Sequence, residues 1–123
     1  MKSLLFKISK SKIGDLIAGI AFGKLSKLLP VDKILENDKA VAFWHPKPLY
    51  RTHILIVPKK AIKNISLIQK EDLDYIAECY SLITKIVNKL ELEKIGYSIT
   101  TNGGNKQEVN QIHFHLYSNE RVE

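Results

Sequence analysis

The stretch Gln111-Ile112-His113-Phe114-His115-Leu116 decides the fold and the chemistry that this sequence predicts. Its polar and apolar residues alternate, and successive side chains of a β-strand point to opposite faces. We therefore expect Gln111, His113 and His115 to share one face that lines a cleft, while the apolar residues enter the core. Imidazole is the side chain best suited to proton transfer, nucleophilic attack or metal binding near neutral pH. The pattern also fits two histidines on a solvated strand face.

The composition indicates one globular domain. The chain has 123 residues, of which 45% are hydrophobic. A net charge of +6 and a pI near 9.4 suggest partners that carry phosphate. Lysine supplies nearly all of this charge, and the only arginines are Arg51 and Arg121. Because bidentate recognition of phosphates and bases favours arginine, we expect no nucleic-acid interface.

Cysteine content and hydropathy together favour a cytoplasmic location. The single cysteine, Cys79, excludes a disulfide framework or a cysteine-rich zinc site and suggests a reducing compartment. The longest apolar stretch, residues 13–22, contains Asp15 and is too short to span a membrane. Lysines interrupt the first residues and no clean cleavage site follows them, so we expect no signal peptide.

Strands and helices are predicted from apolar periodicity. The four expected strands are Lys39–Trp44, Thr52–Val57, Tyr97–Thr101 and Val109–Tyr117. A long helix is expected over residues 70–91, where apolar residues step by three and four, acids lead and lysines trail in agreement with the helix dipole. Residues 3–28 also have helical spacing, interrupted by glycines. Strands grouped with one long helix indicate an α+β domain with an antiparallel sheet.

Several ordered segments resemble the histidine triad (HIT) family of nucleotidyl hydrolases and transferases. The family motif is His-φ-His-φ-His-φ-φ, with φ apolar, and residues 111–117 match it except at the first histidine. The other segments that resemble the family are Phe22-Gly-Lys-Leu25, Pro30–Phe43, Thr52–Lys60 and Asn102–Val109. The resemblance implies a HIT-like domain over residues 22–123, with about four to five antiparallel strands and one long amphipathic helix. Residues 1–21 lie outside it as an N-terminal helical extension.

The resemblance also implies the activity and the residues that perform it. In this family the middle histidine attacks the α-phosphate and forms a nucleotidyl-histidine intermediate, so His113 is the implied nucleophile. The further catalytic candidates are His115, Gln111 and His53, and the candidates for nucleotide binding are Asn102, Gln107, His45, Trp44 and Phe43. The implied substrate is a nucleoside phosphoramidate or a dinucleoside polyphosphate. No cofactor and no metal are expected.

Three departures from the family pattern affect this interpretation. Gln111 replaces the first triad histidine, and an amide donates a hydrogen bond but cannot shuttle a proton. His45 stands where the family usually holds an Asp or Asn for the ribose hydroxyls, and the loop from Asn102 to Gln107 is shorter. Apart from these three, Gly23 occupies the position of the zinc-associated cysteine that some members have, so no structural zinc is expected. The choice between hydrolase and transferase stays open.

Two other classes of function compete with the enzyme. The fold could serve as a nucleotide-binding module without turnover. Alternatively, His45, His53 and the His-x-His pair could hold a transition metal, although four neutral ligands and no nearby acid make this less favoured. The resemblance implies a homodimer. The lysines of residues 1–21 could lie on an anionic membrane surface, but packing on the domain or the dimer is favoured.

Overall fold

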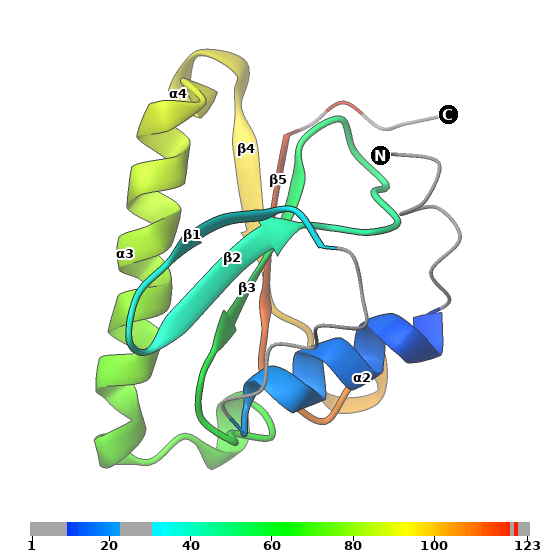
Figure 1. The fold of residues 1–123 in the computed structure, drawn as a ribbon, viewed down its shortest axis with the longest axis vertical. Helices are drawn as coiled ribbons and strands as arrows, with labels where there is room; N and C mark the ends of the chain where they lie inside the picture. Colours follow the sequence, from blue (N-terminus) through cyan, green and yellow to red (C-terminus); the bar gives the residue numbers. More distant parts are fainter. Residues whose placement is uncertain (1–9, 23–30, 119, 121–123) are drawn as a thin grey trace.

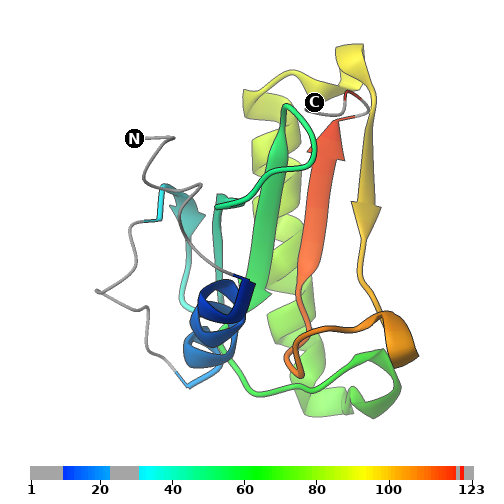
Figure 2. The same ribbon diagram turned by 90° about the vertical axis from the view of Figure 1, so that its right-hand side faces the viewer.

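The computed structural model describes residues 10–22, 31–118 and 120. Within these residues, five strands form a single antiparallel sheet in the order β1-β2-β3-β5-β4. The long helix α3 covers one face of the sheet, and the helix α2 lies against the other (Figure 1, Figure 2). The predicted α+β architecture with an antiparallel sheet is confirmed.

The elements have the following bounds in chain order. The strands are β1 Lys33–Glu36, β2 Ala40–Trp44, β3 His53–Pro58, β4 Tyr97–Thr100 and β5 Phe114–Ser118. The α-helices are α2 Lys10–Ile20, α3 Leu73–Lys89 and α4 Leu92–Ile95, and the 3-10 helices are η1 Ile65–Leu67, η2 Lys70–Asp72 and η3 Gly104–Lys106. No helix in the described ranges is long and apolar enough to cross a membrane.

The alternation of side chains along the central strands produces two separate core clusters. Ile54 and Ile56 of β3 pack with the buried side chains of α3, and this cluster also holds Phe114 of β5. Leu55 and Val57, which point the other way, pack with the buried side chains of α2. The sheet is therefore apolar on both faces, and each face is covered by a different helix.

The same alternation determines on which face the histidines lie. His53 is two residues from Leu55 on β3, so both side chains point to the α2 face. His115 of β5 is directly opposite Leu55 in the antiparallel ladder, and directly opposite residues share a face. The sheet therefore directs these two imidazoles to the side that α2 only partly covers.

Helix α3 confirms the helix predicted over residues 70–91. Its first predicted turn is the 3-10 helix η2, where Asp72 accepts a hydrogen bond from the backbone N–H of Gln69 at 2.8 Å in a capping box. After α3 the chain turns through Glu91 and passes α4. It enters β4 after Gly96, whose φ of 97° favours glycine.

The predicted strand Val109–Tyr117 is wrong over its first five residues, because β5 begins only at Phe114. Before Phe114 the chain bonds to the segment that follows β3. The backbone N–H of Ile112 donates to the carbonyl of Ile62 at 2.8 Å, and the side chain of Gln111 bonds the same segment. These bonds take the place of a regular strand ladder. The short strand β1, half of whose residues are exposed, was not predicted.

Helix α2 occupies the middle of the helical segment predicted over residues 3–28, and residues 3–9 and 23–28 lie outside the described part. Its apolar side chains are buried against β2 and β3; they are Ile13, Leu16, Ile17 and Ile20. For α2, the expectation that this segment packs on the domain is confirmed. Although α2 lies outside the stretch that resembles the family, it shares a core with the sheet.

Candidate active site

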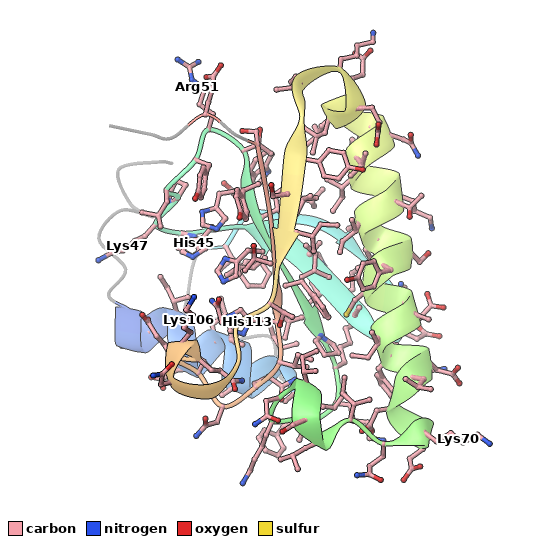
Figure 3. All side chains as sticks on the ribbon, turned by 180° about the vertical axis from the view of Figure 1, so that it is seen from behind. His45, Lys47, Arg51, Lys70, Lys106 and His113 are labelled. Carbon is pink, nitrogen blue, oxygen red and sulfur yellow. The ribbon has the colours of Figure 1, made fainter. Side chains whose placement is uncertain are left out.

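A cavity of about 440 Å³ opens on the α2 face of the sheet. Part of its lining is apolar and comes from Ile13 and Ile17 of α2, together with Val109. The polar part includes all four histidines of the chain, His45, His53, His113 and His115. Figure 3 shows His45 and His113 on the same side of the sheet as α2, away from α3. The cavity therefore combines an apolar wall with a cluster of imidazoles.

The four imidazole rings lie one after another in a continuous row, which we call the histidine file. The ring centroids of His45 and His53 are 4.3 Å apart and stacked, and those of His53 and His115 are 5.2 Å apart. His113 follows at 5.2 Å from His115. His45 comes directly after β2, His53 begins β3, and His113 and His115 lie at the start of β5. The pairing of β2, β3 and β5 thus assembles residues that are far apart in sequence.

Hydrogen bonds determine which ring nitrogen carries the proton in three of the histidines, two through backbone N–H groups and one through a neighbouring histidine. The N–H of Leu49 donates to Nδ1 of His53 at 3.1 Å, so the neutral His53 ring carries its proton on Nε2. That Nε2–H then donates to Nδ1 of His115 at 2.9 Å, which leaves the proton of His115 on its own Nε2. In the same way, the N–H of Lys47 donates to Nδ1 of His45 at 2.9 Å and places the proton of His45 on Nε2.

His113 has the opposite tautomer. Its Nδ1–H donates to the backbone carbonyl of Gln111 at 2.8 Å, so its Nε2 carries a free lone pair. In the described part of the chain, every buried side-chain nitrogen and oxygen has a hydrogen-bond partner. Nε2 of His113 has none, so it must be accessible in the cavity that this residue lines. His113 is therefore the histidine of the file that presents an unprotonated nitrogen to a ligand.

The histidines of the file are neutral at physiological pH. Burial, and to a smaller extent the neighbouring histidines, lower the pKa of His45 and of His115 from 6.5 to about 3. Burial also lowers the pKa of His53 to about 4. The pKa of His113 is lowered by burial too, but the carbonyl of Gln111 and the charge of Glu108 oppose this shift. The tautomers above are thus the relevant states near pH 7.

Gln111 does not face the cavity, and the prediction that it shares a cleft face with the histidines is wrong. Its side chain is 2% exposed, and its Oε1 accepts the N–H of Ile62 at 3.0 Å. Its Nε2 donates to the carbonyl of Lys60 at 2.8 Å and, more weakly, to that of Pro58 at 3.4 Å. Because the chain leaves the ladder before Phe114, the strand alternation does not extend to Gln111. This glutamine joins the base of β5 to the segment after β3.

The structure separates the predicted nucleotide-binding residues into two groups. Asn102 and His45 line the cavity. Phe43 is fully buried under α2, Trp44 packs against the α3 cluster, and Gln107 donates its side-chain N–H to the carbonyl of Lys63 at 2.6 Å. None of these last three is among the residues that line the cavity.

Sequence reasoning missed the cavity residues that lie in loops and in α2. The charged ones are Lys47, Lys106 and Glu108, and the aromatic one is Tyr50, whose ring stacks at 4.2 Å on that of Tyr117, a further cavity residue on β5. The loop between β2 and β3 carries Lys47 and Tyr50, and loops supported by a sheet are where binding residues concentrate. Their position in this loop was the signal from which Lys47 and Tyr50 could have been predicted as cavity residues. Nothing in the sequence pattern indicated that α2 forms an apolar wall of the cavity.

The hydrogen bonds argue against the His45–His53–His115 cluster as a metal site. One nitrogen from each ring lies within 4.8 Å of the others, which is close enough to suggest a ligand set. A histidine that binds metal normally donates its other ring N–H to an acceptor. In His45 and His53 the other nitrogen instead accepts a backbone N–H, so the nitrogen that faces the cluster holds the proton. Coordination by Nε2 would break both of these bonds.

Comparisons with known proteins agree with this fold and this cavity. The model of the HIT domain matches residues 27–122. An uncharacterised HIT-like protein of Helicobacter pylori is 35% identical over 95 residues, which cover 76% of this chain and 88% of that protein. The chain therefore belongs to the HIT family.

Solved structures of HIT proteins share the architecture. A HIT family hydrolase from Legionella pneumophila is 29% identical with a TM-score of 0.73, and the match covers 88% of this chain and 95% of that one. A histidine triad nucleotide-binding protein from Candida albicans is 25% identical with a TM-score of 0.65, and the match covers 77% and 73% of the two chains. The five-stranded sheet with its long helix is thus the HIT fold.

Proposed function

We propose that this protein is a HIT-type nucleotidyl hydrolase or transferase that acts at the α-phosphate of a nucleoside phosphoramidate or a dinucleoside polyphosphate. The observation that carries the proposal is the tautomer of His113. Its Nδ1–H is held by the carbonyl of Gln111, so the lone pair of Nε2 is available in the cavity. The lowered pKa keeps this nitrogen unprotonated at neutral pH. A neutral, oriented imidazole is what nucleophilic attack on phosphorus requires.

The reaction proceeds in two displacements. First, Nε2 of His113 bonds to the α-phosphorus while the bond from phosphorus to the leaving group breaks, and the leaving group departs with the electron pair. A water oxygen then bonds to phosphorus, the phosphorus–nitrogen bond breaks, and the water releases a proton. An acceptor hydroxyl in place of that water gives transfer in place of hydrolysis. Such reactions are catalysed mainly by positioning and by stabilisation of charge on the equatorial oxygens.

His115 is the residue to which we assign the proton of the leaving group. The His53–His115 hydrogen bond directs the Nε2–H of His115 away from His53, and this group has no other partner in the described part of the chain. An anionic phosphate beside an imidazole raises the pKa of the imidazole. His115 is thus neutral in the free protein and gains a proton when substrate arrives. The buried amide of Gln111 takes no part in this transfer.

The remaining cavity residues suit a nucleotide. Lys106 and Asn102 supply donors for phosphoryl oxygens, and the apolar wall of Ile13, Ile17 and Val109 offers a surface for a base. The resemblance to a nucleotide-binding protein of the same fold supports nucleotide binding, and the resemblance to a hydrolase supports hydrolysis. The histidine tautomers support a mechanism that needs no metal.

The first test is turnover of adenosine 5′-phosphoramidate by wild-type protein and by His113→Ala, measured as AMP release with and without EDTA. We expect wild-type turnover that EDTA does not affect. The variant should lose about 10³-fold or more of kcat, because a covalent nucleophile is removed. Mass spectrometry of quenched wild-type protein should detect an adenylyl group on the peptide that contains His113. Equal turnover by the variant, or loss of turnover in EDTA, would contradict the mechanism.

A nucleotide-binding module without turnover is the second candidate. It is favoured by the position of residue 111, because the side chain that replaces the first triad histidine is a buried amide that bonds the backbone and does not line the cavity. The same assay separates the two functions. Binding of AMP by the wild-type protein without any release of product from the phosphoramidate would establish the module.

We also propose that the protein forms a homodimer and works in the cytoplasm. β4 is the last strand of the sheet, and Ile99 on it is 37% exposed. Leu73 and Tyr80, seven residues apart on α3 and thus on one side of that helix, are exposed by 52% and 45%. Sedimentation analysis should give twice the monomer mass, and Ile99→Lys should shift it to the monomer. A wild-type monomer would contradict the dimer, and cell fractionation tests the location.

A further inference from the structure

The two ends of the histidine file differ in charge. His113 lies at one end together with Glu108, whose charge acts on it, and Lys106. His45 lies at the other end, where the backbone of Lys47 bonds its ring. Figure 3 shows Lys106 at the level of His113 and Lys47 at the level of His45. Glu108 is the only carboxylate among the described residues that line the cavity, so at the His45 end the lining contains Lys47 and no acid.

The polar groups at the His45 end are hydrogen-bond donors. The proton of His45 is on Nε2, because Nδ1 accepts the N–H of Lys47. Lys47 is an exposed residue that also lines the cavity, its ammonium group carries three N–H donors, and it forms no ion pair with an acid in the described part of the chain. A sugar hydroxyl both donates and accepts, and it would find no carboxylate here to receive its proton. A phosphate dianion only accepts, and so matches donors of this kind.

We infer that His45 and Lys47 form a second phosphate site, and this inference rests on the proposed function. It binds a phosphate group of the substrate other than the one that His113 attacks. Ring centroids 5.9 Å apart for His45 and His115, and 5.2 Å apart for His115 and His113, place the two sites within one small molecule. The second phosphate belongs either to the ribose, as in a nucleoside bisphosphate, or to a polyphosphate chain.

Calorimetric titration with four nucleotides tests the site and distinguishes these sources. The probes are AMP, adenosine 2′,5′-bisphosphate, adenosine 3′,5′-bisphosphate and ADP. Wild-type protein should bind at least one of the last three about tenfold or more tightly than AMP, as expected for a charge-assisted phosphate contact. Preference for a bisphosphate identifies the ribose as the source, and preference for ADP identifies the polyphosphate chain.

Three variants show whether His45 and Lys47 cause that preference. Lys47→Ala should reduce the preference over AMP to about twofold or less, and His45→Asp should reverse it because a carboxylate repels phosphate. Lys70→Ala is the matched control, since Lys70 is an exposed lysine on η2 at a distance from the cavity (Figure 3) and should leave every affinity unchanged.

The outcomes separate this inference from the function on which it rests. If AMP binds wild-type protein and none of the other three nucleotides binds more tightly, the second site is wrong while the proposed function stands. If Lys47→Ala and Lys70→Ala have the same effect, the preference is general electrostatics and the assignment to Lys47 is wrong. If none of the four nucleotides binds and the phosphoramidate is not hydrolysed, the function and the second site both fail.

Discussion

The two faces of the sheet are built from the same strands and yet have opposite properties. The face under α3 is a closed apolar core, in which even the sole cysteine, Cys79, is fully buried and has its pKa raised to about 12. The face under α2 is apolar only over part of its area and then opens into a cavity with four histidines. Strand alternation supplies both faces, and within the described residues a different helix covers each of them. α3 has 17 residues and α2 has 11.

A single strand can therefore contribute to stability on one face and to chemistry on the other. In β3, Ile54 and Ile56 point into the α3 cluster, while His53 points into the cavity. Substitutions on the α3 face should therefore change the free energy of unfolding with little effect on the chemistry. Substitutions of cavity residues should do the reverse.

The largest effect on stability should come from Ile86→Ala on the α3 face. Ile86 is fully buried, and truncation of a buried isoleucine removes apolar contacts and leaves a cavity. We expect a loss of about 2–5 kcal/mol in the free energy of unfolding, measured with urea, and an unchanged kcat in the folded fraction. Lys85→Ala, at the exposed neighbouring position, is the control and should stay within about 0.5 kcal/mol. A strong fall in kcat with Ile86→Ala would show that the two faces are coupled.

A smaller loss in the free energy of unfolding is expected from Gln111→Glu. Gln111 lies just before β5, where the chain passes from the buried segment to the cavity. The glutamate can still accept the N–H of Ile62, but it cannot donate to the carbonyl of Lys60 and faces that carbonyl as a buried charge. We expect a loss of about 1–3 kcal/mol in stability. We also expect a fall in kcat, because the carbonyl of residue 111 orients His113.

Asn110→Ala is the matched control for Gln111→Glu, because Asn110 is exposed and next to it in sequence. Circular dichroism with urea titration measures the stability, and AMP release measures the rate. Wild-type stability in Gln111→Glu would show that the side-chain bonds of Gln111 contribute nothing.

The third prediction is a pH dependence of the free energy of unfolding, which arises from the histidines on the cavity face. The pKa values of His45, His53 and His115 are depressed in the folded state, so between about pH 4 and 6.5 the unfolded chain binds more protons. Their contribution to stability is therefore complete above pH 6.5 and is lost as pH falls through this window. Asp72, whose pKa is lowered by Lys60, loses its contribution only below its ordinary value of 3.8.

Urea unfolding at a series of pH values measures this slope, and His45→Asn should make it shallower. The asparagine keeps a polar side chain but does not titrate, so the unfolded chain loses one proton-binding group. Identical slopes for wild type and His45→Asn between pH 4 and 6.5 would show that His45 keeps its ordinary pKa in the folded protein.

The sequence by itself determined the features that depend on local periodicity and on ordered motifs. Alternation placed the His113 segment with an apolar partner face, steps of three and four defined α3, and the ordered segments identified the family, which the comparisons confirm. These features are encoded by residues close together in the chain. A period of two or of 3.6 is therefore enough to predict them.

Which side chains meet in the cavity depends on contacts between distant segments, and the sequence did not predict it. Gln111 occupies the first histidine position of the motif, but its side chain bonds the backbone of Ile62, 49 residues away, and does not line the cavity. Helix α2, outside the motif, supplies an apolar wall, and Lys47 gives His45 its donor tautomer. The physical reason is that hydrogen bonds between distant segments set the direction of each buried polar group. No local pattern records where those partners will lie.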